Sequence, residues 1–387
     1  MNHALKIPKS IRRPLTRRQK IGLSVLTICL LYLCLWPVSI EPVSWESPPN
    51  HGLAGPFAEN HRLSKAILIS VAPRHGPEAL ALGPDGWLYT GTQDGAILRI
   101  NPRSHIVESV ANTGGRPLGL AFHSDGLLYI TDAYLGLLRV GPHGEVTVLA
   151  NTYRGQPIRY ADDLDIGDDG RIYFSDATTG ISAKSLNSPF EASRLDINEH
   201  GAKGRLLGFD PTTAELTLLR EGLNFANGVA VSHDGNAILV CETGHYRVIR
   251  HWLRGPKAGK SDVLVAGLPG FPDNIKRGSQ GRYWVGLVSP RSRALDALSE
   301  YPFLRKMVFR LPRWLQPDAR AHGHIISIDD NGHVHENLQD PTGRVAYTTG
   351  AIEVDGHLYV SSLHRAAVAQ VSLPRARRET GASVQGD

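Results

Sequence analysis

The sequence predicts an all-β protein, a six-bladed β-propeller, attached to a single N-terminal transmembrane helix. Three observations carry this prediction. A unit made of a turn and an apolar strand recurs six times along the chain, and a run of 20 uncharged, mostly apolar residues precedes the first copy. The composition of the 387 residues, 41% hydrophobic and 20% charged, is that of a globular protein and excludes a mostly disordered or fibrous chain.

The charge distribution argues against nucleic-acid binding. The formal charge of the chain is +5, but the first 20 residues carry seven basic and no acidic side chains. Removing these seven from 42 Lys and Arg leaves 35 basic against 37 acidic residues, a net charge of −2 for the remainder. A domain that binds phosphates needs a basic face on its folded part. We therefore expect no nucleic-acid partner.

Residues 21–40, IGLSVLTICLLYLCLWPVSI, contain no charged side chain, and at 1.5 Å per residue they match a bilayer core of about 30 Å. The flank before this run is basic and the flank after it begins with Glu41, so the positive-inside rule places the N-terminus in the cytoplasm. The propeller is then extracytoplasmic, held by a single-pass signal anchor. A cleaved signal peptide is the alternative, but no small-x-small cleavage site is evident.

The predicted division of the chain follows from this segment and from composition. We expect a basic cytoplasmic tail over 1–20, the anchor over 21–40, a Pro- and Gly-rich linker over 41–60, the propeller over 61–373 and a disordered tail over 374–387. Cys29 and Cys34 lie in the apolar run, which leaves Cys241 as the one thiol of the soluble part. No disulfide can form within the propeller, so its core must hold it together.

The six copies of the repeat are predicted hairpins. Asp-Gly between alternating apolar strands is a strong hairpin signal, because glycine accepts the positive φ of the turn. The copies read PDGWLYTGT from Pro84, SDGLLYITD from Ser124, DDGRIYFSD from Asp168, HDGNAILVCE from His233, SQGRYWVGL from Ser279 and VDGHLYVSS from Val354. Their turn glycines are 40, 44, 65, 46 and 75 residues apart, at Gly86, Gly126, Gly170, Gly235, Gly281 and Gly356. Units of about 40–50 residues built of short strands have the length of propeller blades.

Two of these spacings are long and predict insertions over roughly 178–203 and 288–323. The second insertion contains RALDALSEYPFLRKMVFRLPRWL, whose apolar residues recur at helical intervals and predict a short amphipathic helix. Two positions for this helix fit the pattern equally well. It can lie over the channel or membrane surface, or it can pack on the rim of the propeller.

Polar side chains recur eight residues before the turn glycines, at the start of the innermost strand of each predicted blade. The six residues at this offset are Glu78, Leu118, Asp162, Asn227, Asp273 and Thr348. Equivalent positions of successive blades are related by rotation about the propeller axis, so we expect these side chains to converge on it. A lone Asp or Asn near a turn is usually a cap or a turn partner. Four carboxylates or amides at one rotationally equivalent position instead indicate a shared ligand.

The donor set indicates a calcium site. Three carboxylates without a cation would repel one another and raise one another's pKa. Oxygen donors without Cys or His favour Ca²⁺ or Mg²⁺ over Zn²⁺; irregular multidentate geometry favours Ca²⁺, and another divalent cation is the alternative. The predicted ligands are Glu78, Asp162, Asn227 and Asp273, with Asn274 as a further oxygen donor.

The blocks YADDLDIGDDGRIYFSDAT, GLNFANGVAVSHDG, FPDNIKRGSQGRYWVG and EVDGHLYVSSL resemble the strictosidine synthase-like family, in particular its membrane-anchored branch, the adipocyte plasma membrane-associated proteins. The resemblance spans roughly 66–373 and extends more distantly to gluconolactonases (the senescence marker protein-30 group), paraoxonases and diisopropylfluorophosphatases. It implies a six-bladed propeller in which a Glu, two Asn and an Asp hold a catalytic divalent cation, usually calcium. Glu78, Asn227 and Asp273 match these ligands, and Asp162 stands where an Asn is usual.

Two departures limit what the resemblance implies. Strictosidine synthase has a catalytic Glu seven residues before the last turn glycine, where this chain has Thr349, so condensation of an amine with an aldehyde is not expected. Paraoxonases have a catalytic His at the offset-eight position of the second blade, where this chain has Leu118. The sequence also lacks the G-x-S-x-G elbow of α/β serine hydrolases.

We therefore expect a membrane-anchored, calcium-dependent hydrolase of small-molecule esters or lactones, in which the cation polarises the substrate carbonyl. Water or Asp273 attacks that carbonyl, and Asp163 either orients a ligand or accepts a proton, a plain turn role being the alternative. His322, His324 and His364 are candidates for a general base near the channel mouth. The competing hypothesis is a non-catalytic propeller that keeps a structural calcium ion and binds a partner or lipid on its upper face.

Overall fold

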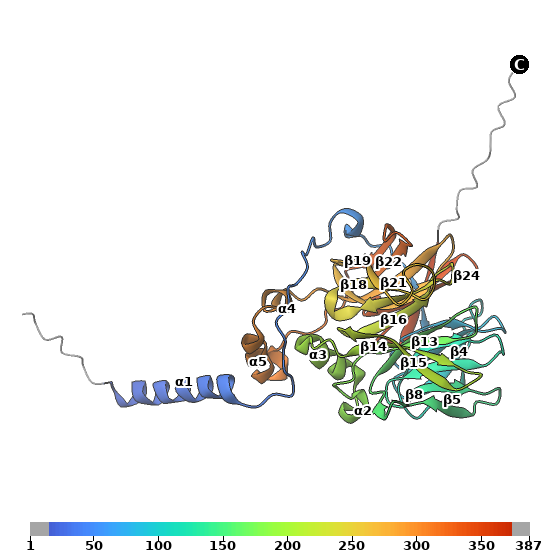
Figure 1. Cartoon of the computed structure of the whole chain (residues 1–387). Helices are drawn as coiled ribbons and strands as arrows, with labels where there is room; N and C mark the ends of the chain where they lie inside the picture. The colour runs from blue at the N-terminus through green and yellow to red at the C-terminus, as the bar shows by residue number, and fades with distance from the viewer. Residues whose placement is uncertain (1–14, 374–387) are drawn as a thin grey trace, which may run out of the picture.

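Residues 15–373 are described by a computed structural model, in which six four-stranded antiparallel sheets form the blades of a propeller (Figure 1). The predicted tail over 374–387 and most of the predicted basic segment over 1–20 lie outside the described residues. The prediction of a six-bladed propeller that follows an N-terminal apolar helix is confirmed.

The first five blades are each built from consecutive strands, beginning with the innermost one. Blades 1 and 2 comprise β2 (Ala81–Leu82), β3 (Leu88–Gly91), β4 (Ala96–Ile100) and β5 (Val107–Asn112), then β6 (Pro117–Phe122), β7 (Leu128–Asp132), β8 (Gly136–Val140) and β9 (Val146–Ala150). A small hairpin of β10 (Thr152–Tyr153) and β11 (Gln156–Pro157) precedes blade 3, which comprises β12 (Ala161–Ile166), β13 (Ile172–Asp176), β14 (Gly204–Asp210) and β15 (Glu215–Leu223). Blades 4 and 5 comprise β16 (Ala226–Val231), β17 (Ala237–Glu242), β18 (Arg247–Trp252) and β19 (Ser261–Val265), then β20 (Gly270–Arg277), β21 (Arg282–Pro290), β22 (Gly323–Asp329) and β23 (Val334–Asp340).

Blade 6 joins the two ends of the domain. Its three inner strands are β24 (Thr348–Val354), β25 (His357–Ser362) and β26 (Ala367–Ser372). The outermost strand is β1 (Ile67–Ser70), which comes from the start of the domain and pairs antiparallel with β26. This pairing closes the ring and covers the edge that β26 would otherwise expose.

The six predicted hairpins connect the first and second strands of the six blades. All six turn glycines have positive φ values, between +67° and +80°. The hydrophobic core lies between the blades that these hairpins build. One cluster joins Leu239 and Val248 of blade 4 to Ile275 and Val285 of blade 5. Because neighbouring blades share such clusters, the core is continuous around the ring.

Helix α1 (Arg17–Leu35) is the candidate membrane span. It begins with a capping box between Thr16 and Gln19, and none of its residues is buried. Its 19 residues extend about 28 Å and are apolar enough to cross a membrane. The predicted span over 21–40 extends five residues beyond the C-terminal end of this helix. The helix ends at Leu35 because Pro37 disfavours the helical conformation for the residue before it.

Residues 40–60 form a strap on the surface of the propeller. Ile40 and Trp45 are buried, and the Trp45 backbone N–H donates to the Ser299 carbonyl at 3.2 Å. Arg291 donates to the carbonyl of Pro48 at 2.8 Å. The Pro and Gly content of this segment predicts a linker, but its apolar side chains find a surface to pack on, and the segment is held along the domain.

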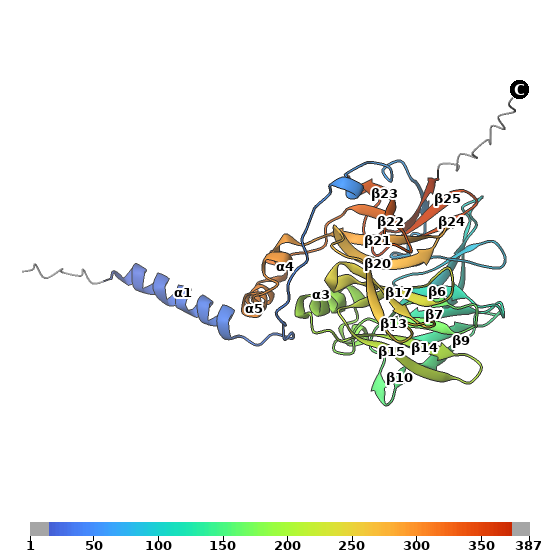
Figure 2. The same cartoon turned by 45° about the horizontal axis from the view of Figure 1, so that its top comes forward.

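Both predicted insertions are helical, and the second insertion, together with the longer helix of the first, lies between α1 and the propeller, as Figure 2 shows. The first, between β13 and β14, contains α2 (Ala183–Leu186) and α3 (Pro189–Glu199). The second, between β21 and β22, contains α4 (Arg293–Ala297), α5 (Pro302–Arg310) and the 3₁₀ turn η3 (Arg313–Leu315). Arg194 of α3 donates to Gln316 at 2.7 Å, so the two insertions meet. We call them together the helical cap.

Candidate metal centre

A cavity of about 480 Å³ lies between the helical cap and the innermost strands of the propeller. Five of the six residues predicted from the offset-eight pattern line it: Glu78, Leu118, Asp162, Asn227 and Asp273. The cap supplies the opposite wall, with Phe190 and Ile197 from α3 and Val308 and Phe309 from α5. The structure therefore brings together, from five blades, side chains that lie 195 positions apart at the extremes of the sequence.

Irregular pairing of the innermost strands directs these side chains. In blade 3, Ala161 pairs with Asp176 and Leu164 with Phe174, so Asp162 and Asp163 together face one residue of β13. The same two-against-one bulge falls at Asn227 in blade 4 and at Asp273 in blade 5. Bulges re-aim side chains locally. Here they turn the first bulged residue into the cavity, whereas Asp163 and Asn274, the second bulged residues, do not line it.

Blade 6 departs from the offset. Its bulge covers Thr349 and Gly350, one residue later than the equivalent positions of blades 3 to 5. The Thr349 hydroxyl accordingly donates to the Glu78 carbonyl, whereas the Thr348 hydroxyl donates to the Leu287 and His324 carbonyls of blade 5. Thr348 is therefore not at the axis, and Thr349 takes the place beside Glu78.

The four polar residues of the cavity floor are buried and incompletely hydrogen-bonded. Each is at most 5% exposed. One oxygen of each lacks a hydrogen-bond partner: Glu78 Oε2, Asp162 Oδ2, Asn227 Oδ1 and Asp273 Oδ1. Buried polar oxygens nearly always have a hydrogen-bond partner. Four buried oxygens without one, all lining the same cavity, indicate that a ligand binds them. We call these four side chains the axial oxygens.

Burial dominates the electrostatics of the axial oxygens. It raises the pKa of Glu78 to about 7, although the charge of Arg116 counteracts the rise. Burial also raises the pKa values of Asp162 and Asp273 well above their usual range, and the negative charge of Glu78 adds to both rises. The charge of Glu78 thus disfavours the ionisation of both aspartates, and a cation beside the three carboxylates would stabilise their charged forms.

The chemistry of this donor set fits a hard divalent cation. Its donors are carboxylate and amide oxygens, without a sulfur or an imidazole. Within residues 15–373, no group of three or more His, Cys, Asp or Glu side chains is arranged to hold a metal ion by itself. The donor set that a cation would use here also includes the Asn227 amide oxygen, Oδ1, which has no hydrogen-bond partner.

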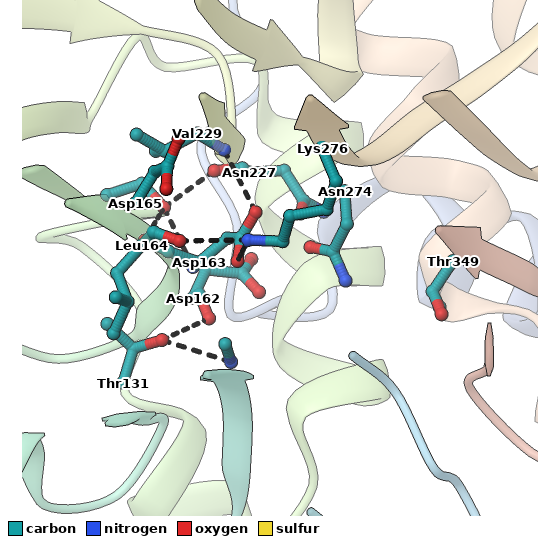
Figure 3. Close-up of polar contacts among 12 residues, drawn as sticks. Thr131, Asp162, Asp163, Leu164, Asp165, Asn227, Val229, Asn274, Lys276 and Thr349 are labelled. Carbon is teal, nitrogen blue, oxygen red and sulfur yellow. Dashed lines mark hydrogen bonds and ion pairs between the residues drawn. The ribbon is translucent and has the colours of Figure 1, made fainter. Parts of the chain in front are cut away.

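Hydroxyl groups of neighbouring blades hold the backbone beneath the axial oxygens. Thr131 of β7 donates to the Asp162 carbonyl at 2.6 Å, as Figure 3 shows, and Ser175 of β13 donates to the Asn227 carbonyl at 2.6 Å. Thr243 donates to the Pro272 carbonyl, next to Asp273, at 2.7 Å. With Thr349 on Glu78, each of the four blades carrying an axial oxygen receives one such bond across a blade boundary. We call these four side chains the hydroxyl latches.

Asp163 lies outside the cavity and is fully engaged. Its Oδ1 accepts from Lys276 Nζ at 2.7 Å, and its Oδ2 accepts from the Val229 backbone N–H at 3.0 Å (Figure 3). Lys276 also donates to the Leu164 carbonyl at 2.8 Å, so the pair ties blade 3 to blades 4 and 5. This placement fits the predicted orienting role of Asp163. It does not fit proton acceptance from a substrate in the cavity.

Asn274, the fifth predicted ligand, also lies beside the cavity. Its Nδ2 donates to the Glu78 carbonyl at 3.1 Å, and its buried Oδ1 has no hydrogen-bond partner. Asn274 thus positions Glu78 through the backbone, and its free oxygen keeps it a candidate ligand.

The three histidines proposed as general bases do not line the cavity. His322 contacts Gln339 Oε1 at 3.2 Å, and burial lowers its pKa. Burial lowers the pKa of His324 to about 3. His364 packs edge-on against Phe190 and Tyr347, and burial lowers its pKa as well. The prediction that one of them acts on a substrate in the channel has no support in their positions.

Sequence reasoning missed two cations near the axial oxygens, the buried Arg116 and the partly buried Lys276. Arg116 is 2% exposed and donates to the Gly76 carbonyl at 2.9 Å. Neither residue belongs to the offset-eight set. The signal that could have found Lys276 is its position three residues after Asp273, on the same strand as a predicted ligand.

Comparisons with known proteins agree with this architecture. The family described as "Strictosidine synthase-like, N-terminal" matches residues 55–100, and "Strictosidine synthase" matches residues 162–256. An adipocyte plasma membrane-associated protein of Salmo salar is 34% identical over 382 residues, covering 92% of this chain and 89% of the relative. Protein strictosidine synthase-like 3 of Arabidopsis thaliana is 34% identical over 360 residues, covering 85% of this chain and 90% of the relative.

Solved structures share the fold at low sequence identity. A gluconolactonase from Xanthomonas campestris superposes with a TM-score of 0.59 and 16% identity, covering 81% of this chain and 91% of the other. A calcium-binding regucalcin from Agrobacterium tumefaciens superposes with a TM-score of 0.55 and 15% identity, covering 79% of this chain and 92% of the other. The extent and identity of the sequence matches show that the chain belongs to the strictosidine synthase-like family, alongside the adipocyte plasma membrane-associated proteins.

Proposed function

We propose that this protein is a membrane-anchored, calcium-dependent hydrolase of small-molecule esters or lactones. The observation that carries the proposal is the set of axial oxygens, four buried and unpartnered donors from four blades on the floor of a cavity under the helical cap. The shared fold with a gluconolactonase and a calcium-binding regucalcin supports it.

Different residues of the chain would bind the cation, surround the substrate and position the strands in such a reaction. Glu78, Asp162, Asn227 and Asp273 would hold the cation, with Asn274 as a further candidate. A bound calcium ion supplies a Lewis acid that polarises the substrate carbonyl and stabilises the developing oxyanion. The apolar wall of the cap would shield the bound substrate from bulk solvent while leaving room for the one water that reacts. The hydroxyl latches and the Asp163–Lys276 pair fix the strands on which the donors stand.

Asp273 is the residue we assign to proton transfer. Its Oδ1 lines the cavity floor without a hydrogen-bond partner. Water adds to the carbonyl carbon while its proton passes to the Asp273 carboxylate. The bond to the leaving oxygen then breaks, and that oxygen takes the proton. Direct attack by the same carboxylate on the carbonyl carbon is the variant of this route.

Membrane attachment through α1 is part of the proposal. After its basic first turn the helix carries no charged residue, and relatives of this chain are named plasma membrane-associated proteins. The basic residues before α1 place its N-terminal end in the cytoplasm under the positive-inside rule, with the propeller on the extracytoplasmic side.

One observation favours a second candidate, a non-catalytic propeller that keeps a structural calcium ion and binds a partner. Among the described residues that line the cavity there is no histidine, so the common general base of hydrolases is missing from it. Thr349 beside Glu78 is engaged as a latch and carries no acid-base chemistry at neutral pH.

Turnover measurements separate the two candidates. The full chain in detergent is assayed against a panel of aryl acetates and lactones, with calcium and after EDTA. A hydrolase shows calcium-dependent turnover that Asp273→Asn abolishes. If calcium raises the melting temperature but no member of the panel is turned over, the binding module replaces the hydrolase.

A further inference from the structure

Helix α5 has an inverted distribution of polarity. Its apolar residues Phe303 and Leu304 are 53% and 40% exposed, whereas its arginines Arg305 and Arg310 are 1% and 8% exposed. A helix on a water-facing surface shows the opposite arrangement, with the charges outward. The exposed face of α5 is therefore adapted to an apolar environment.

The buried arginines fix α5 to its neighbours through backbone carbonyls. Arg310 donates to the Leu33 carbonyl at 2.8 Å and to the Trp36 carbonyl at 2.5 Å, at the C-terminal end of α1. The last carbonyls of a helix have no intrahelical partner, so these bonds complete them. Arg305 donates to the Asn198 carbonyl at the end of α3 at 2.7 Å and to the Val43 carbonyl of the strap. The cap is thus held at the end of the candidate span.

Exposed apolar side chains continue from the end of α1 across the second insertion. They are Leu35, Trp36, Tyr301, Phe303, Leu304, Trp314 and Leu315, and Trp314 is the most exposed at 80%. We call this set the apolar face. Contiguous exposed apolar surface marks an interaction site, and tryptophan and tyrosine are enriched where proteins meet the membrane interface. Because the face continues the candidate span at its outer end, its occupant is the lipid bilayer and not a separate protein.

The other side of the same helix lines the cavity. Val308 and Phe309 of α5 and Leu295 of α4 form part of the cavity wall. Phe309 also packs under the Arg194 guanidinium, 4.9 Å from the ring centre, which joins α5 to α3. One thin layer of helix therefore has the apolar face on one side and the cavity with the axial oxygens on the other.

We propose that the helical cap lies in the membrane interface and that the cavity receives its substrate from the bilayer. The substrate class is then an amphiphilic ester or lactone with a long apolar chain. The chemistry of this substrate rests on the proposed function, whereas the seating of the cap on the membrane stands on the apolar face alone.

The seating is tested with the full chain in nanodiscs made of brominated phospholipid, which quenches tryptophan fluorescence on contact. Trp314→Phe is compared with Trp252→Phe, a change on a strand of blade 4. We expect Trp314→Phe to lose a measurable part of the lipid-dependent quenching and Trp252→Phe to lose none. Equal quenching of the wild type and Trp314→Phe overturns the seating.

The substrate class is tested with a charge placed on the apolar face. Phe303→Glu with Leu304→Glu is compared with Val148→Glu with Val263→Glu, a matched pair of equally exposed apolar residues on the outer strands of blades 2 and 4. Each variant is assayed with a long-chain lactone in vesicles and with a short, water-soluble lactone. We expect the first pair to raise KM for the vesicle-borne lactone at least about tenfold and to leave hydrolysis of the soluble lactone unchanged.

The outcomes distinguish this inference from the proposed function. Equal loss on both substrates, or no loss on either, overturns the membrane route. Quenching at Trp314 without hydrolysis of any lactone supports the seating and overturns the substrate class together with the proposed function.

Discussion

Two buried carboxylates of blade 3 stand on neighbouring strands and have opposite surroundings. Asp176, at the end of β13, accepts from the Tyr160 and Arg159 backbone N–H groups at 3.0 and 3.2 Å and from Arg205 at 2.9 Å. Asp162, on β12, is equally buried, yet its Oδ2 has no partner and lines the cavity. Burial is therefore common to both, and the difference lies in hydrogen bonding.

The same division runs through the propeller. Asp132 in blade 2 and Glu242 in blade 4 end the second strand, as Asp176 does, and accept backbone N–H groups at the start of the innermost strand. Glu78 and Asp273 resemble Asp162 in keeping an unpartnered oxygen. A satisfied carboxylate builds the blade, whereas an unsatisfied one indicates a site that something else completes.

The largest expected effect is at Asp273. Asp273→Ala removes a donor and the proposed proton acceptor, so turnover should fall at least about a thousandfold, equivalent to more than about 4 kcal/mol in the barrier. The rise in melting temperature on adding calcium should disappear. Leu118→Ala, at the same offset without an oxygen, serves as control in differential scanning fluorimetry. Equal calcium responses in the two variants would contradict the assignment of carboxylates with an unpartnered oxygen to the metal site.

Asp176→Ala should act on stability instead. It leaves Arg205 buried without its counter-ion, and breaking a buried pair in this way costs about 4 kcal/mol of unfolding free energy. Urea unfolding measures the loss, and the calcium response of the folded variant should remain. In EDTA, Asp273→Asn should have the opposite sign and raise the melting temperature, because it removes an unpaired buried carboxylate. A loss of stability in Asp273→Asn as large as that in Asp176→Ala would show that both carboxylates are structural.

The pH dependence of stability tests whether Glu242, a fully hydrogen-bonded carboxylate, is ionised in the fold. Burial raises its pKa, but hydrogen bonds from His245 and Arg247 outweigh that effect and hold the pKa at about 2, below the ordinary 4.5. A carboxylate with a lowered pKa stabilises the fold above its unfolded pKa, by an amount on the order of 3 kcal/mol, and the contribution is lost as the pH falls from about 5 toward 2. The stability gap between wild type and Glu242→Gln should therefore narrow between pH 5 and pH 3 in urea titrations. A gap that stays constant would show that the carboxylate is not ionised in the fold.

The smallest effect is expected at the hydroxyl latches. Thr131→Val removes the bond to the Asp162 carbonyl and leaves the Gly119 N–H without its acceptor, which costs about 1 kcal/mol of stability. Because the latch sets the strand that carries Asp162, calcium affinity should fall about tenfold in calorimetric titration. Thr90→Val is the matched control, since Thr90 is equally buried and its hydroxyl bonds the neighbouring Gly91 carbonyl. A similar loss of calcium affinity in both variants would show that the hydroxyl latches do not position the axial oxygens.

The repeat made the fold predictable. Asp-Gly turns at blade-length spacing predict six hairpins from local chemistry alone, and rotation about an axis then places Glu78, Asp162, Asn227 and Asp273 together. The outermost strand of blade 6 was not predictable in this way, because β1 has no turn glycine and pairs with a strand about 300 positions away. The position of the strap was not predictable either, because Ile40 and Trp45 pack against residues distant in the sequence and Arg291 bonds the Pro48 carbonyl.

Counting residues gave the positions of the axial oxygens but not their surroundings. Asp162 and Asp163 are adjacent and chemically identical, and a bulge in β12 decides that the first lines the cavity and the second meets Lys276. The same count pointed to Thr348, one residue from Thr349, because the bulge of blade 6 is displaced. Strand register is set by pairing across the sheet, so it cannot be deduced by counting residues along one strand.

Anomalous scattering from crystals of the protein grown with calcium tests the central claim most directly. The account predicts one calcium peak at the cavity floor, within about 2.3–2.6 Å of oxygens from Glu78, Asp162, Asn227 and Asp273. Absence of a peak at that point, with the four side chains paired to one another or to water, would contradict the assignment of the axial oxygens as a metal centre.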